Sequence, residues 1–268
     1  MPIAIQSSFA FRLDQPTDVL LQFEAAAIPE QAVLTCETTL SPAQHCARVG
    51  AQDDIGQRIW IRAEGEFEVA YTATVRPRRL LAELTELERL PPHKLPGHAV
   101  KYLFDSRYCA ADKFQSFVQA EFGDLNGGAR IVAMRDWIAD NFSYQAGTSD
   151  ATTGASDSFI QRCGICRDFA HVMIALARAS AIPARYVACY DPGVDPPDFH
   201  AVAEVFLSDL TTPGGGAWHI VDATRMADPA RTVKIGVGRD AADVSFMTTF
   251  GSAEFLRSSV SVRQLDDE

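Results

Sequence analysis

The stretch from Arg162 to His171, RCGICRDFAH, constrains the fold more than any other part of the chain. Behind it, apolar side chains recur at the spacing of one helix face, at Ile165, Phe169, Val172, Met173 and Leu176. Gly164 breaks the chain before this helix, and Pro183 marks its end because the residue before a proline is pushed out of the α region. The sequence therefore predicts a buried helix whose first turn contains Cys166.

A cysteine in the first turn of a helix is chemically unusual. The unpaired N–H groups and the helix dipole favour an anion at that position. A thiol placed there generally has a lowered pKa, so that thiolate is available near neutral pH. Cys166 is therefore the candidate nucleophile of this chain.

Charge and composition exclude several classes of partner. The net charge of −11 and the isoelectric point near 5.0 argue against nucleic acid, because phosphate binding needs a basic surface. The opening residues, MPIAIQ, lack the basic and apolar regions of a signal peptide, and no later segment is apolar enough to span a bilayer. Six cysteines in 268 residues are too sparse for a disulfide scaffold. We expect a soluble, cytoplasmic protein with reduced thiols and no membrane association.

The first part of the chain, residues 3–77, has the pattern of successive β-strands. Ile3, Ile5, Phe9 and Phe11 share one parity of a period-two pattern, and residues 67–72 alternate in the same way. Several short strands at this spacing favour an antiparallel sandwich or barrel. We therefore predict an N-terminal all-β, sandwich-like domain over residues 1–90.

A change of character follows this β region. Residues 80–90 are rich in helix formers, and residues 91–96, PPHKLP, form a stiff connector. A helix is predicted after Gly127 and Gly128, and strands are predicted at 185–190, 200–207 and 217–222. The second domain, residues 91–268, is thus of mixed type, and the whole chain is predicted to be α+β.

The last two of these strands can be aligned from the residue numbers of the positions that face each other. If Leu207 faces Ala217 across the loop of a regular antiparallel hairpin, His200 and Asp222 are one diagonal step apart. Diagonal side chains still reach one another, at roughly 7–8 Å or less. A carboxylate beside a histidine fixes the tautomer and stabilises the imidazolium. If this end of the hairpin faces Cys166, the chain assembles a nucleophile, a base and an orienting group.

Four segments in this order carry a resemblance to a known family. They are GICRDFAH at 164–171, IPARYV at 182–187, HAVAEV at 200–205 and WHIVDAT at 218–224. Together they resemble the bacterial transglutaminase-like superfamily. The N-terminal β region is similar to the domain often fused ahead of such proteins.

The resemblance implies a papain-like core with a Cys-His-Asp triad on Cys166, His200 and Asp222. In acyl transfer, Cys166 attacks an amide carbonyl, His200 takes and returns the proton, and Asp222 orients His200. The backbone N–H of Cys166 is expected to stabilise the oxyanion, with Gln161 as a second donor. We expect a peptide or amide substrate and a cysteine protease or amidase. Whether water or an amine resolves the thioester is not decided by the triad, and no metal or organic cofactor is implied.

Other functions for the same residues stay open at this point. Cys163 and Cys166 form a CxxC, which at a helix start is typical of a thiol-disulfide oxidoreductase, although the preceding residues 156–161 are mostly polar and unlike a buried strand. These cysteines with His171 or His200 are possible zinc ligands, but no second cysteine pair has ligand spacing. Finally, Cys166 can be a buried structural thiol in a non-catalytic binding module on the same fold.

Overall fold

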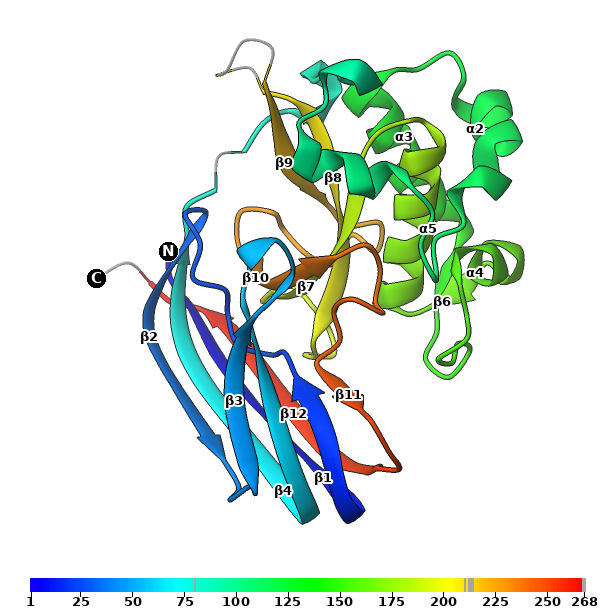
Figure 1. Cartoon of the computed structure of the whole chain (residues 1–268). Helices are drawn as coiled ribbons and strands as arrows, with labels where there is room; N and C mark the ends of the chain where they lie inside the picture. Colours follow the sequence, from blue (N-terminus) through cyan, green and yellow to red (C-terminus); the bar gives the residue numbers. More distant parts are fainter. Residues whose placement is uncertain (80, 210, 212–214, 267–268) are drawn as a thin grey trace.

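The computed structural model describes residues 1–79, 81–209, 211 and 215–266. It has the predicted α+β architecture with antiparallel sheets (Figure 1). A long, curved sheet near both termini stands beside a smaller sheet, and the helices gather on the far side of that smaller sheet. The candidate functional residues Cys166, His200 and Asp222 lie in this second, helix-covered part.

In the described part of the chain, the larger sheet has the order β11-β1-β4-β2, with β12 also pairing β1 and β3 also pairing β4. Odd-numbered apolar residues of β1 and β4 are buried, whereas most of their even-numbered neighbours are exposed or half-buried, as period-two alternation requires. The strands are β1 (Ile3–Leu21), β2 (Gln31–Leu40), β3 (His45–Gly50), β4 (Gln57–Pro77), β11 (Met247–Thr249) and β12 (Glu254–Gln264).

Two strands of this sheet come from the C-terminal part of the chain, which corrects the predicted division at residue 90. β12 runs antiparallel to β1 from the pair Ile3↔Gln264 onward, and β11 pairs with the other end of β1. The prediction placed all residues from 91 to 268 in the second domain. Local periodicity indicates that a strand exists but does not reveal its partner, so this return of the chain was missed.

The smaller sheet has the order β10-β7-β8-β9 and is also antiparallel. Its strands are β7 (Ala184–Tyr190), β8 (His200–Ser208), β9 (Gly216–Val221) and β10 (Val233–Gly238), and a short parallel pair joins β5 (Ser143–Tyr144) to β6 (Cys163–Gly164). The helices are α1 (Gly97–Val100), α2 (Gln115–Phe122), α3 (Gly127–Asn141), α4 (Ala155–Gln161) and α5 (Cys166–Ala179). Within the described ranges, no helix has the length and apolar character needed to cross a bilayer.

The 3₁₀ turns are η1 (Gln52–Asp54), η2 (Leu84–Glu86), η3 (Pro92–Lys94), η4 (Lys101–Leu103) and η5 (Ala111–Phe114). η2 lies in the 80–90 segment, of which Leu80 is outside the described residues. Helix formers are abundant there, but the described residues 81–90 form no helix longer than this turn. Residues of this segment bond to other elements instead. Leu87 O accepts Gly128 N–H, and Ser208 N–H donates to Glu88 O. Tertiary contacts override helix propensity here.

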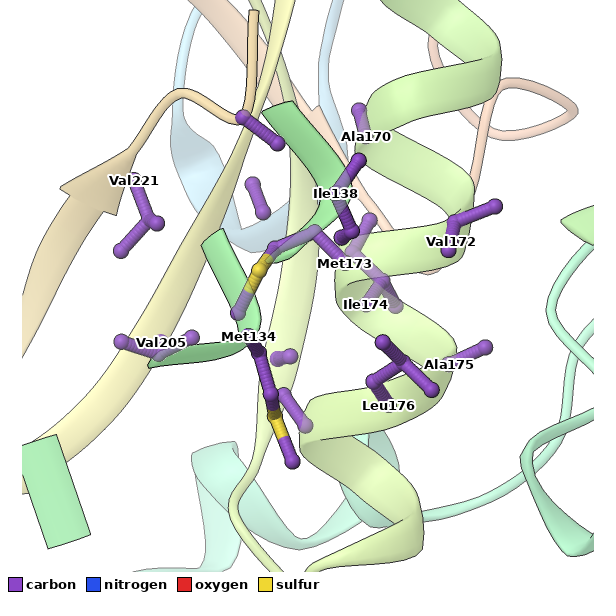
Figure 2. Packing of buried hydrophobic residues seen from close by; sticks show 14 of the residues in the cluster. Met134, Ile138, Ala170, Val172, Met173, Ile174, Ala175, Leu176, Val205 and Val221 are labelled. Carbon is purple, nitrogen blue, oxygen red and sulfur yellow. The ribbon is translucent and has the colours of Figure 1, made fainter. Parts of the chain in front are cut away.

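Helix α5 is the centre of the core beside the smaller sheet. Figure 2 shows Met173 projecting from α5 towards the smaller sheet and α3, where it belongs to the same cluster as Val205, Val221, Met134 and Ile138. These side chains are essentially inaccessible to solvent. Truncating a buried methionine or leucine of such a core to alanine typically costs about 2–5 kcal/mol. The start of α5 is therefore held firmly against the sheet.

The larger sheet packs its apolar face on β7 and β10 rather than on a second sheet of the N-terminal region. Tyr190 of β7 and Ile235 of β10 belong to the same buried cluster as Phe9 of β1 and Tyr71 of β4. The Tyr190 hydroxyl also donates to Phe23 O at 2.7 Å. The sheet that carries the candidate histidine and the N-terminal sheet therefore share one apolar core.

Candidate active site

The helix α5 begins at Cys166, as predicted. Asp168, in the first turn, is fully buried, and its Oδ2 accepts the Ile165 N–H at 2.9 Å and the Ser149 hydroxyl at 2.6 Å. Gly164 makes room for this carboxylate, because a Cβ on Gly164 would lie 2.6 Å from Asp168 Oδ2. Gly164 and Asp168 together determine where the helix starts, and hence where Cys166 lies.

His200 and Asp222 meet in the way the hairpin alignment predicts. Leu207 pairs with Ala217. His200 is the first residue of β8, Asp222 follows the last residue of β9, and His200 Nε2 lies 2.9 Å from Asp222 Oδ2. Both side chains are buried. The predicted base and the predicted orienting carboxylate are thus in direct contact.

The Asp222 carboxylate accepts hydrogen bonds from other groups besides His200. Its Oδ1 accepts the Thr224 N–H and the Thr224 hydroxyl, each at 2.8 Å, and its Oδ2 also accepts the Ala227 N–H at 2.8 Å. Burial raises the pKa of Asp222. The hydrogen bond and charge of His200, together with these backbone bonds, lower it by more, so that the pKa lies below its usual value. Asp222 is therefore an ionised, rigidly placed partner for the imidazole.

The imidazole of His200 is polarised from both sides. Burial lowers the pKa of His200, but hydrogen bonds to Asp222 and Cys166, together with their negative charges, raise it to about 10. Asp222 bonds to Nε2, and Nδ1 has no hydrogen-bond partner among the described residues. Nδ1 is therefore the ring nitrogen left for the Cys166 thiol, whose charge acts on this imidazole. This arrangement can form a thiolate–imidazolium pair.

Tyr144 is a site residue that the sequence reasoning missed. It lies in β5, where it pairs with Gly164, two residues before Cys166, and its ring is 6.0 Å from that of Phe169. Burial, then the charge of Cys166, raises the pKa of Tyr144 to about 12, while a hydrogen bond to the Cys166 backbone acts in the opposite direction. A two-residue strand has no periodicity to read, so only the pairing of β5 with β6 reveals this neighbour.

Gln161 and Cys163 lie on the approach to α5. Gln161, the proposed second oxyanion donor, is the exposed last residue of α4 and stays a prediction. Cys163 is half-buried in β6, opposite Ser143, and its thiol is free. In the described ranges, no group of three or more His, Cys, Asp or Glu side chains is arranged to hold a metal ion.

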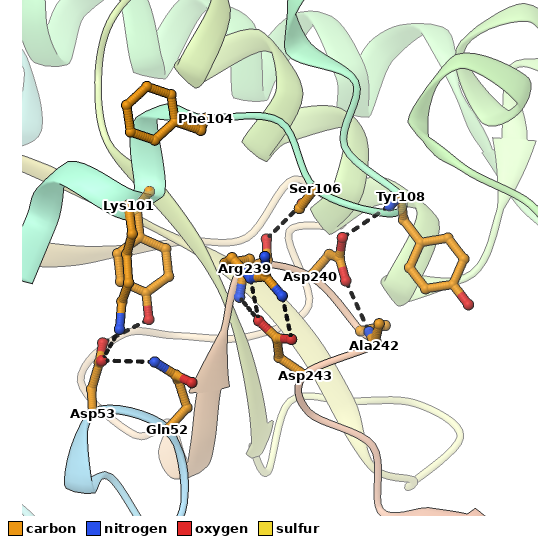
Figure 3. Close-up of polar contacts among 12 residues, drawn as sticks. Gln52, Asp53, Lys101, Phe104, Ser106, Tyr108, Arg239, Asp240, Ala242 and Asp243 are labelled. Atoms are coloured by element: carbon orange, nitrogen blue, oxygen red, sulfur yellow. Dashed lines mark hydrogen bonds and ion pairs between the residues drawn. The ribbon is translucent and has the colours of Figure 1, made fainter.

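His171, considered above as a zinc ligand, is a buried structural residue. Its Nε2 accepts the Ala241 N–H at 3.2 Å, and burial lowers its pKa to about 3, so the ring is neutral. Figure 3 shows the neighbouring contacts: Asp240 accepts the N–H groups of Tyr108 and Ala242, each at 2.9 Å. Arg239 pairs with Asp243 at 2.9 Å in the same segment. These contacts fasten residues 239–243 over α5.

Comparisons with known proteins agree with this geometry. The model of the transglutaminase-like superfamily matches residues 116–223, which include Cys166, His200 and Asp222. A solved structure of a candidate cysteine protease from Cytophaga hutchinsonii is 34% identical, with a TM-score of 0.89, and the match covers 100% of this chain and 92% of that one.

Curated relatives match a shorter region. An uncharacterised protein of Mycobacterium tuberculosis is 34% identical over 119 residues, which are 40% of this chain and 37% of the relative. One of Mycobacterium leprae is 29% identical over 116 residues, 43% of this chain and 42% of the relative. The chain thus spans less than half the length of these mycobacterial proteins.

Proposed function

This chain belongs to the transglutaminase-like superfamily, and from that premise we propose that it is a cysteine-dependent hydrolase that cleaves amide or peptide bonds through a thioester. The observation that carries the proposal is the 2.9 Å contact between Asp222 and His200, which leaves Nδ1 of the same ring for Cys166. A structural thiol requires neither a histidine nor an oriented carboxylate beside it.

In the first half of the reaction, the Cys166 thiolate attacks the substrate carbonyl and the amide C–N bond breaks. The proton held by His200 passes to the leaving nitrogen, which departs as an amine. Asp222 stabilises the imidazolium before this transfer and keeps the ring in place after it. Atoms balance because the thioester keeps the acyl group and the amine takes the proton.

In the second half, the environment of His200 changes. Part of its raised pKa comes from the hydrogen bond and charge of Cys166, and acylation removes that charge. The pKa of His200 therefore falls once the thioester has formed, and the neutral ring takes a proton from an attacking water. The C–S bond then breaks, the acyl group leaves as a carboxylic acid, and the Cys166 thiolate and the His200 imidazolium are restored. One histidine thus acts first as an acid and then as a base, according to the charge of the sulfur.

The oxyanion formed in each half needs hydrogen-bond donors. The backbone N–H of Cys166 stands at the start of α5, where no carbonyl of the preceding turn competes for it. The hydroxyl of Tyr144, close to both the backbone and the side chain of Cys166, is a second donor in this proposal. We prefer it to Gln161 because its hydroxyl bonds to Cys166, although the side chains of Tyr144 and Gln161 are both exposed.

Water is proposed as the acyl acceptor because the structurally similar Cytophaga hutchinsonii protein is described as a candidate cysteine protease. A peptide library incubated with and without a labelled primary amine tests this by mass spectrometry. We expect free carboxylate products in both mixtures, with none from a Cys166→Ala variant. Predominant amine adducts would identify a transglutaminase instead, and the absence of both products would refute acyl transfer on these substrates.

A further inference from the structure

A hollow lies along the outer edge of the smaller sheet. It is a groove of about 600 Å³ between β9, helix α3 and the connection that leaves β4. Figure 1 shows this connection passing on the outer side of β9. Asp222 lies at one end of the groove, but neither Cys166 nor His200 is among the described residues that line it. The groove is therefore distinct from the thiol side of the site.

The backbone of β9 has unused hydrogen-bonding groups on this side. In the described part of the sheet, β9 is an edge strand that pairs with β8 alone. Phe206 of β8 donates its N–H to Pro183 O at 2.8 Å, away from β9. Because antiparallel residues alternate in the direction of their bonds, the partner of Phe206, Trp218, turns its N–H and C=O away from β8. Ile220 does the same two residues later.

A buried arginine points into the same groove. The Arg79 side chain is only 6% exposed, and its Nη1 donates to Pro229 O and, at 3.0 Å, to Thr232 O. Its Nε lies 3.6 Å from Glu30, but its Nη2 has no partner among the described residues. A buried guanidinium N–H without an acceptor is unfavourable, so a ligand that supplies an oxygen would be bound strongly there.

The other charges of the lining are already engaged. Arg135 and Arg225 both contact Asp136. Among the carboxylates, Asp222 is saturated by its triad contacts, as described above, and Asp228 pairs with Arg231. Glu83 accepts both the N–H and the hydroxyl of Thr85. His219 adds one more donor or acceptor, since its Nε2 is unpartnered in the described structure.

We propose that this groove binds an extended peptide as an additional strand on β9, with a carboxylate of the peptide against Arg79. The backbone groups of Trp218 and Ile220 provide the ladder, and Arg79 provides the charge-assisted contact. The volume suits a few residues of peptide rather than a folded partner. The proposal is independent of thioester chemistry, so it can hold even if Cys166 proves inert.

The test uses the full chain with Cys166→Ala, which prevents turnover. A fluorescein-labelled peptide of alternating threonine and valine with one central glutamate is titrated by anisotropy, beside the same peptide with glutamine. We expect saturable binding of the glutamate peptide and about tenfold weaker binding of the glutamine peptide. Arg79→Gln should remove this difference. If that variant does not fold, the difference in affinity between the glutamate and glutamine peptides on the Cys166→Ala protein still tests whether the groove prefers a carboxylate.

Two further peptides test strand addition itself. Each has N-methyl groups on alternate backbone nitrogens, in the odd positions of one peptide and the even positions of the other. A peptide strand presents only one of these sets to β9, so we expect one methylated peptide to lose about tenfold or more in affinity while the other binds normally. Equal binding of both, no saturable binding up to about 1 mM, or loss of binding when Cys166 of the wild-type chain is alkylated would overturn the proposal.

Discussion

His200 Nε2 and Asp222 Oδ2 lie 2.9 Å apart, although the two residues do not face each other in the β8–β9 ladder. The last ladder pair at this end joins Ala203 to Val221, so β8 continues to His200 after β9 has ended. Asp222 is thereby released from the sheet and turns towards the ring.

Asp222→Asn should leave a folded protein with little activity. The amide can favour the wrong imidazole tautomer, and we expect the rate of thioester formation to fall by about 10³–10⁴. It also places an NH₂ against donors that now bond to a carboxylate, so we expect a loss of about 1–3 kcal/mol in the free energy of unfolding. Urea unfolding and single-turnover kinetics measure both quantities. An unchanged rate in the folded variant would reduce the site to a Cys166–His200 pair.

Thioester formation should persist to unusually high pH. The pKa of His200 is raised to about 10, so the imidazolium that protonates the leaving group is lost only above that value. The same raised pKa stabilises the fold fully below the ordinary value of 6.5, and this contribution disappears as the pH rises towards about 10. Removing the carboxylate in Asp222→Asn should move the alkaline decline to lower pH. The pH–rate profiles of the two proteins measure this shift, and coincident declines would contradict the assignment.

Cys166 should be the first thiol to react with iodoacetamide at mildly acidic pH. Alkylation needs a thiolate, and Cys166 has the His200 imidazolium beside it. Burial raises the pKa of Cys109, to about 12, and that of Cys189. Peptide mass spectrometry after brief labelling identifies the site. Earlier labelling of Cys109 or Cys189, or of the exposed Cys36, would count against the thiolate–imidazolium pair.

Cys163→Ser should retain most of the activity. An acyl-transfer mechanism uses only Cys166, whereas a dithiol–disulfide cycle requires both thiols of the CxxC. Cys163 is half-buried in β6, and serine is close to it in size, so we expect a small change in stability. The rate of substrate cleavage by this variant, with Cys166→Ser as the inactive control, separates the two mechanisms. Equal inactivation by the two substitutions would favour the redox alternative.

Glu204→Gln should destabilise the fold far more than a surface substitution does. Glu204 is fully buried, and its carboxylate pairs with Arg185 and Lys234. Burial raises its pKa, but these two cations lower it to about 2. The substitution leaves both cations without their buried partner, and we expect a loss of about 3–5 kcal/mol at pH 7.

This loss should depend on pH with a definite sign. A lowered carboxyl pKa stabilises the fold above the ordinary value of 4.5, and the contribution declines as the pH falls towards about 2. The gap between wild type and Glu204→Gln should therefore narrow by about 1.4 kcal/mol between pH 7 and 3.5, measured by urea unfolding. Glu66→Gln is the matched control, because Glu66 pairs with Arg257 in solvent and should change stability by less than about 1 kcal/mol.

The sequence was sufficient for the features that rest on local patterns. The start of α5 at Cys166 follows from apolar spacing and a glycine, and the contact of His200 with Asp222 follows from hairpin arithmetic. These are short-range relationships, in which chain connectivity limits the possible geometry.

Features that depend on long-range contacts were not predictable in the same way. Tyr144 approaches Cys166 only because β5 pairs with β6 across α4. The buried pairing of Arg185 and Glu204 with Lys234 joins three strands, and nothing in a charged residue's own sequence neighbourhood marks it as buried. Residues 81–90 are rich in helix formers, yet they form the short 3₁₀ turn η2, and Leu87 and Glu88 bond to other elements.

The pairing of β12 with β1 has a consequence for the order in which the protein is assembled. During synthesis, Cys166, His200 and Asp222 are all added to the chain before residues 254–264 of β12. A nascent chain of that length has the three candidate triad residues, while the edge of β1 that will bind β12 is still open. Such an edge is a template for pairing with other chains. The interval between the emergence of Asp222 and that of Gln264 is therefore when the growing polypeptide is most exposed to misassembly.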